Sequence, residues 1–254
     1  MKQKKLISYC YIAISIYNYR NKMGIKKRIL ESNRLNEILL LSISSIGCIG
    51  LSLFRYIYSD TKVYLFLNWN LFLAFLPWLL SFSMVLFPKV KDNKIFLTSL
   101  LLSWIAFFPN APYILTDLFH LKLQSNVPIW FDLMLILSFA WTGLLFGFIS
   151  LFQIENLFSF RLNPRYISAF SIMFLFISGF GVYIGRFLRW NSWDILTNPI
   201  LLFNDILHRF INPFQHPRTW GMTILMGLFL TFVYFTLKYF QKSNENRTLS
   251  DIKV

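Results

Sequence analysis

The chain has 254 residues, of which 56% are hydrophobic and only 14% are charged, and this composition excludes an ordinary soluble domain. The formal net charge of +14 raises the question of nucleic-acid binding. The positive charges, however, lie at the ends of apolar stretches and in an N-terminal arm, where membrane orientation and anionic headgroups place them. The sequence contains no basic groove interleaved with aromatic residues, so we expect no nucleic-acid partner.

Residues 1–35 are predicted to form a basic cytoplasmic arm. Within this arm, Leu6–Tyr19 is apolar but too short to cross about 30 Å of hydrocarbon, and it lacks the small-residue cleavage site of a signal peptide. We expect it either to lie on the inner membrane surface or to be outside the native fold. Met23, which precedes the basic stretch GIKKR, is an alternative start.

Residues 36–241 are predicted to form a membrane domain, an all-α, polytopic helix bundle. Window hydropathy predicts six spans, at Asn36–Tyr58, Val63–Phe87, Ile95–Leu118, Ile129–Ile154, Tyr166–Trp190 and Trp220–Phe240. Before the last span, Asn198 and Pro199 form a helix start, and apolar residues then recur at helical spacing until Pro213. We predict one amphipathic helix there, lying in the membrane interface. Residues 242–254 are predicted to be a polar cytoplasmic tail.

The distribution of Lys and Arg predicts the orientation of the bundle. These residues are concentrated in the N-terminal arm, in alternate connections and at the C-terminal end, and are scarcer in the other connections. By the positive-inside rule, both termini are therefore cytoplasmic.

The stretch Phe108–Leu121, FPNAPYILTDLFHL, is the most unusual part of the sequence, because polar residues interrupt a long apolar run. Pro109 and Pro112 each remove a backbone donor and are expected to push the preceding residues out of helical conformation. A break of this kind is tolerated at membrane depth only against protein or a wet cavity. If the helix resumes after the break, Asp117 and His120 share one face.

The predicted orientation brings polar ends of several spans to the extracytoplasmic side. The residues expected to gather there are Asn110, Asp117, His120, Asp132, Arg186, Arg189, Trp193 and Asp194. Four stretches far apart in the sequence thus place costly residues at one depth, and we expect Asp117, Asp132, Arg186 and Arg189 to meet in one crevice.

Three long motifs give the chain a likeness to a known family. FPNAPYILTDLFHL, WFDLML and GRFLRWNSW, followed by PRTW before the last span, resemble the bacterial membrane family catalogued as domain of unknown function 1361. The likeness covers roughly residues 64–221. It implies a multi-pass protein of the bacterial inner membrane, and it brings no established activity from which catalytic residues could be carried over.

The polar residues allow three interpretations. The acids and arginines could neutralise one another and hold helices together. Alternatively, Arg186 and Arg189 could bind an anionic group, with Asn110, Trp193 and Asp194 beside it and with Asp117, His120 and Asp132 in proton chemistry. A pure metal site is less favoured, because the arginines repel a cation, and we expect no metal or cofactor. Arg55 is expected to reach the interface or to pair with Asp60, and His208 and His216 to be solvated.

These interpretations give three hypotheses for function. The first is that the protein binds or processes an anionic lipid or lipid-linked headgroup at the outer leaflet. The second is a transporter in which the broken third span forms part of a substrate or proton path. The third is a structural membrane subunit whose ion pairs only hold the bundle together. The sequence leaves open whether the protein is an enzyme.

Overall fold

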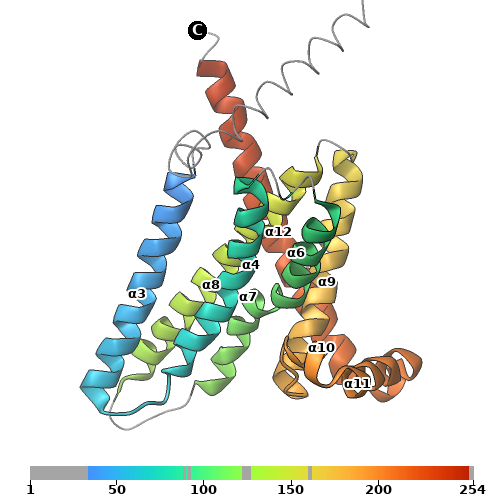
Figure 1. Ribbon diagram of the computed structural model, residues 1–254. Coiled ribbons are helices and arrows are strands. Elements are labelled where there is room, and N and C mark those ends of the chain that lie inside the picture. The colour runs from blue at the N-terminus through green and yellow to red at the C-terminus, as the bar shows by residue number, and fades with distance from the viewer. Residues whose placement is uncertain (1–33, 88–89, 91–92, 122–126, 160–161, 252–254) are drawn as a thin grey trace, which may run out of the picture. The chain divides into compact units, whose positions relative to one another are not determined.

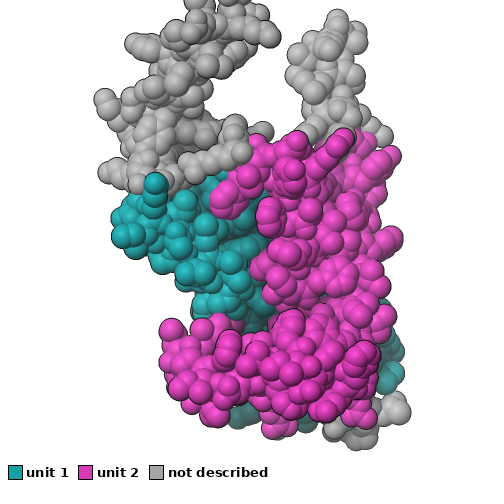
Figure 2. Space-filling view, turned by 90° about the vertical axis from the view of Figure 1, so that its right-hand side faces the viewer, with its two compact units in different colours: residues 1–157 teal, residues 158–254 magenta. Residues whose placement is uncertain are grey.

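The computed structural model describes residues 34–87, 90, 93–121, 127–159 and 162–251 (Figure 1). The described residues form helices and no strand, which confirms the predicted all-α class. The basic arm predicted at residues 1–35 lies almost entirely outside them. Contacts divide the chain into two compact units, unit 1 at residues 1–157 and unit 2 at residues 158–254 (Figure 2).

Unit 1 contains four of the expected spans. Its helices are α3 (Leu35–Ser59), α4 (Phe66–Leu86), α6 (Lys94–Phe107), α7 (Asn110–Tyr113), the 3₁₀ helix η1 (Ile114–His120) and α8 (Ile129–Phe158). Unit 2 follows with α9 (Pro164–Phe187), α10 (Asp194–Thr197), α11 (Pro199–Ile211), the 3₁₀ helix η2 (Pro213–Gln215) and α12 (Pro217–Asp251).

Six helical segments in the described part of the chain are long and apolar enough to cross a membrane. They are Leu35–Ser59, Phe66–Leu86, Lys94–His120, Ile129–Phe158, Pro164–Phe187 and Pro217–Gln241. Each overlaps its predicted span, and the ends differ by a few residues. The helix predicted to follow Asn198 is also present, since α11 begins at Pro199 and ends at Ile211.

The expectation that the prolines of the third span push both preceding residues out of helical conformation is wrong, because Ala111 lies within α7 and Phe108 has a helical backbone. Phe108 has φ −55° and ψ −40°, within the right-handed helical region, and its N–H donates to the carbonyl of Trp104. The local preference against this conformation before proline is outweighed by backbone hydrogen bonds, including Ala111 to Phe108 and Tyr113 to Pro109. The α-helix is interrupted only at the turn residues Phe108 and Pro109, resumes as α7 and changes to 3₁₀ helix at Ile114.

A close approach of α7 to α8 explains how this segment is held. A Cβ atom on Gly143 would lie 2.9 Å from the carbonyl oxygen of Ala111 and 2.9 Å from Cδ1 of Ile114. One on Gly147 would lie 2.9 Å from the Cβ of Ala111. Two glycines four residues apart on α8 therefore make room for α7, the small-residue packing that is common between membrane helices.

Unit 2 uses the same device between its two long helices, α9 and α12. A Cβ on Gly179 would lie 2.9 Å from the carbonyl oxygen of Thr223, and Gly227 faces the ring of Phe176 without room for a side chain. Short connections and α10 and α11 complete this unit, and Phe210 of α11 packs edge-on against Trp220 at a ring-centroid distance of 5.1 Å.

Candidate functional site

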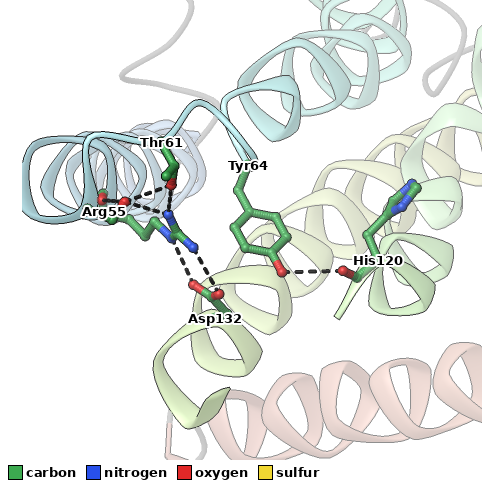
Figure 3. Close-up of polar contacts among 6 residues, drawn as sticks. Arg55, Thr61, Tyr64, His120 and Asp132 are labelled. Atoms are coloured by element: carbon green, nitrogen blue, oxygen red, sulfur yellow. Dashed lines mark hydrogen bonds and ion pairs between the residues drawn. The ribbon is translucent and has the colours of Figure 1, made fainter. Parts of the chain in front are cut away.

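A buried ion pair links α3 to α8 in unit 1 (Figure 3). The Nε of Arg55 donates to Oδ1 of Asp132 at 3.0 Å, and its Nη2 donates to Oδ2 at 3.2 Å. The two side chains are 2% and 1% exposed, so the ion pair is buried inside the protein. Both oxygens of Asp132 are thus held by one guanidinium fork, the geometry that gives the strongest carboxylate binding.

Three further residues complete what we call the Arg55 cluster: Ser59, Thr61 and Tyr64. The Nη1 of Arg55 donates to the hydroxyls of Ser59 and Thr61. The guanidinium carbon lies 5.3 Å from the ring centroid of Tyr64, within range of a cation–π interaction. Every face of the guanidinium therefore meets protein, as a charge in an apolar bundle requires.

Tyr64 connects this cluster to η1. Its hydroxyl donates to the backbone carbonyl of His120 at 3.3 Å. Figure 3 shows this carbonyl, and not the imidazole, turned toward Tyr64. The His120 side chain is exposed and its ring meets Phe66 edge-on at 5.3 Å. The backbone of η1 is therefore tied to the cluster, while the His120 ring is accessible.

The predicted pairing of Arg55 with Asp60 is wrong. Asp60 forms the left-handed C-cap of α3, with φ 50°, and its residue is exposed, whereas Arg55 is 2% exposed and binds Asp132. Hydropathy could not reveal this, because Asp132 lies 77 residues further along the chain. The sequence signal was a basic residue inside the first span and an acidic residue inside the fourth, since such residues usually require a partner.

Asp117 is also buried in unit 1. Its side chain is fully enclosed, at 0% exposure, and Nδ2 of Asn70 on α4 donates to its Oδ2 at 2.7 Å. Asn110, seven residues earlier on α7, donates from Nδ2 to the carbonyl of Phe107 at 2.9 Å. The amide of Asn110 thus satisfies a backbone carbonyl at the end of α6, and the amide of Asn70 satisfies the buried carboxylate of Asp117.

Unit 1 contains a second group of polar residues, the Glu37 cluster, which the sequence analysis did not predict. Its members are Glu37, Trp78, Ser81 and Gln153, with Arg34 at its edge. The Oε1 of Glu37 accepts from Nε1 of Trp78 at 2.6 Å and from Nε2 of Gln153 at 2.5 Å. Ser81 donates to Oε1 of Gln153 at 2.8 Å, and Arg34 lies 3.3 Å from Oε2 of Glu37. A lone glutamate near the start of a predicted span was the available signal.

Three polar contacts fix the register of α3 against α8. Glu37 meets Gln153, Cys48 lies 3.3 Å from the hydroxyl of Thr142, and Arg55 meets Asp132. The positions rise along α3 as they fall along α8, as they must for antiparallel neighbours. Since apolar contacts alone discriminate weakly between registers in lipid, these contacts specify the pairing.

Unit 2 carries the predicted arginines at the end of α9. Arg186 is half-buried in the last turn, and Arg189 is exposed just beyond it. Arg189 has φ 61°, the left-handed region that usually belongs to glycine and that costs other residues about 1–2 kcal/mol. Trp193, four residues later, is 41% exposed. An exposed cation and an exposed indole thus lie close in sequence on a strained turn.

The acids of unit 2 near this end have other partners. Asp205 on α11 accepts from Nε1 of Trp190 at 2.8 Å, and its Oδ1 lies 3.6 Å from Nη1 of Arg209. Asp194 accepts from the backbone N–H of Asn191 at 2.7 Å and from Thr197 at 3.1 Å. The hydrogen bond from the Asn191 backbone lowers the pKa of Asp194, so the carboxylate is ionised.

His208 and His216 form a hydrogen-bonded pair in which His208 is exposed, as predicted, and His216 is half-buried. Nδ1 of His208 lies 2.9 Å from Nε2 of His216, so one ring donates and the other accepts. Desolvation, followed by the nearby charge of Arg209 and by His208, lowers the pKa of His216. The pair fastens the end of α11 to the start of α12.

The predicted site residues fall into two sets. Asn110, Asp117, His120 and Asp132 belong to unit 1, and Arg186, Arg189, Trp193 and Asp194 belong to unit 2. The Arg55 cluster ties Asp132 to the η1 segment that carries Asp117 and His120. That the two sets meet in one crevice stays a prediction. Among the described residues, no group of three or more His, Cys, Asp or Glu side chains is placed to hold a metal.

Six long apolar helices, with ionisable residues confined to buried pairs and helix ends, define an all-α, multi-pass integral membrane protein. More particularly, the chain belongs to the family described as Protein of unknown function (DUF1361), which matches residues 69–233. The match includes Asp117, Asp132, Arg186 and Arg189 and leaves out Arg55. No curated protein and no solved structure matches the chain.

Proposed function

We propose that the protein is a bacterial inner-membrane protein that binds an anionic lipid or lipid-linked headgroup at its extracytoplasmic end, with both termini in the cytoplasm. The single observation that carries this proposal is the exposed Arg189 just beyond α9, which has φ 61° and lies four residues before the exposed Trp193. Asp132 is bound by Arg55 within unit 1, and Asp194 and Asp205 have partners within unit 2.

The exposed end of α9 has the chemistry that a phosphate or carboxylate group requires. A guanidinium presents a planar fork to such oxygens, and an indole beside it suits the headgroup region of a bilayer. The strained backbone of Arg189 supports a functional role, since unusual backbone conformations cluster at binding sites. Exposed apolar residues on the neighbouring α11, such as Leu201 and Phe203, suit a helix lying in the interface.

If the bound headgroup is also processed, the buried Asp117 and the exposed His120 are the candidates for proton chemistry. Asp132 is the least suited of the predicted acids, because both of its oxygens already accept from Arg55. In this proposal Asp132 has a positioning role: it holds Arg55, and through Tyr64 the Arg55 cluster holds the η1 backbone.

Native mass spectrometry of the protein released from phosphatidylglycerol nanodiscs tests the proposal. We expect the double variant R186A/R189A to lose retained anionic lipid by about tenfold or more, the loss expected for one or two charge-assisted contacts. Arg165→Ala is the control for position, since it removes one exposed positive charge from the opposite end of α9. Equal retention by the double variant and the control would contradict the proposal.

A deletion strain provides the cellular test. Untargeted lipid profiling should show an altered headgroup pattern, which complementation with Arg165→Ala restores and complementation with R186A/R189A does not. Comparison of Asp117→Asn and His120→Ala then separates processing from binding, because the loss of a catalyst should leave headgroup retention intact.

A transporter is the second candidate, and one observation favours it. The third span is interrupted at Phe108 and Pro109, changes to 3₁₀ helix at Ile114 and carries the enclosed Asp117. Interrupted helices of this kind form substrate sites in transporters. An unchanged lipid profile together with altered solute uptake in the deletion strain would favour this candidate over headgroup binding.

A further inference from the structure

Unit 1 contains an elongated groove that the proposed function does not use. It is lined by residues of α3 and α4 and by Phe146 of α8, and its volume is about 420 Å³. On α4 its lining extends from Asn68 to Trp78, which at 1.5 Å per residue is about 15 Å along the helix. Both helices are membrane spans, so the groove runs along the direction of the lipid chains.

The lining of the groove favours an apolar ligand such as a hydrocarbon chain. It is formed mainly by large apolar side chains, and its polar members, Ser42, Ser45 and Asn68, carry no charge. The volume lies within the range of about 300–1,000 Å³ that is typical of small-molecule sites. An ion or a hydrophilic solute would lose its hydration here without compensation.

One polar atom in the groove lining points to a more specific ligand. The Oδ1 of Asn68 is buried and accepts no hydrogen bond from any of the described residues. Its orientation is determined, because Nδ2 donates to the carbonyl of Leu65 at 3.1 Å and to Ser52 at 2.9 Å, and a carbonyl can only accept. An amide oxygen without a donor is costly in an apolar environment. The missing partner is a donor.

Trp78 lines the other end of the groove. Trp78 is 8% exposed, and its Nε1 is engaged by Glu37, so the indole presents carbon to the groove. A chain therefore fits with its apolar end toward Trp78 and its polar end toward Asn68.

We propose that this groove binds one hydrocarbon chain of a membrane lipid that carries a hydroxyl or amide N–H at its polar end, and that Asn68 Oδ1 accepts from this donor. The site lies wholly within unit 1 and involves neither Arg186 nor Arg189. Its failure would leave the headgroup proposal intact, and the reverse also holds.

Photolabelling in nanodiscs tests the chain site. The probes are a long-chain alcohol carrying a diazirine in its chain and the methyl ether of the same alcohol, and labelled residues are located by mass spectrometry. We expect labelling of Leu41 and Phe75 in the groove to exceed labelling of Ile43, which is 68% exposed on α3 outside the groove. Ser45→Phe should abolish groove labelling, whereas Ile43→Phe, the matched control, should not.

The two probes test the role of Asn68. The alcohol should label the groove about fivefold more strongly than the ether, as one hydrogen bond of ordinary strength implies. This difference should disappear in Asn68→Leu while labelling by the ether persists, which also shows that the groove is still formed. Equal labelling of Ile43 and the groove, or crosslinks from the groove to a second protein, would overturn the proposal.

Discussion

Among individual residues, Arg55 and Asp132 have the clearest structural role. Neither is tolerated alone in an apolar bundle, because a buried charge without its partner retains its desolvation cost. The pair joins helices that are distant in sequence, and the hydroxyls of Ser59 and Thr61 satisfy donors that the acid does not reach. The main role of the Asp132 carboxylate is therefore to stabilise the fold by binding Arg55.

We predict that Arg55→Ala and Asp132→Asn each lower the free energy of unfolding by about 3–5 kcal/mol, measured in mixed micelles with increasing denaturant. The double variant R55M/D132L should regain most of this loss, since apolar residues of similar size can replace a buried pair. Arg34→Ala is the control. Its pair with Glu37 is partly exposed, at 16% and 19% of the side chains, so the effect should stay within about 1 kcal/mol. If Arg55→Ala and Asp132→Asn lower the free energy of unfolding no more than Arg34→Ala does, the structural role of the Arg55–Asp132 pair is refuted.

Among the elements, α8 organises unit 1. It contains a fully buried apolar stretch that includes Leu135, Ile136 and Phe139. It also supplies polar side chains that bind α3, and two glycines, Gly143 and Gly147, that make room for α7. The third span is held in its mixed α and 3₁₀ conformation by this contact. Small residues on α8 thus position Asp117, although they lie far from it in the sequence.

Gly143→Ala is expected to destabilise unit 1 by about 1–3 kcal/mol, because the added methyl group meets the Ala111 carbonyl and the Ile114 side chain. Gly50→Ala, in the middle of α3, has no atom within 4 Å of the added methyl group and should be neutral or stabilising by up to about 1 kcal/mol. Thermal unfolding of the two variants in the same detergent measures the difference. Equal melting temperatures would show that α7 does not depend on this glycine.

At the scale of the whole molecule, the distribution of positive charge predicts the orientation in the membrane. Lys62 follows α3, and Arg165 begins α9; both residues are exposed, and the predicted topology places them on opposite sides. In a background in which Cys10 and Cys48 are replaced by serine, a cysteine at Lys62 should react with an impermeant maleimide in intact cells. A cysteine at Arg165 should react only after lysis. The reverse pattern would invert the proposed orientation and move the α9 arginines to the cytoplasmic side.

The sequence by itself determined which segments are helices. Apolar length identified the six spans, and the position of Asn198 and Pro199 with apolar spacing identified α11, because helix formation in lipid depends on local composition and on backbone hydrogen bonds within one segment. The same local reasoning misjudged Phe108, where backbone hydrogen bonds outweighed the preference of a residue before proline.

Only the tertiary structure decided which polar residues are partners. Arg55 binds Asp132 and not Asp60, Glu37 meets Trp78 and Gln153, and Asn68 lines a groove with an unsatisfied oxygen. Hydropathy carries no information about these pairings, because helices in lipid select neighbours by shape and by a few polar contacts.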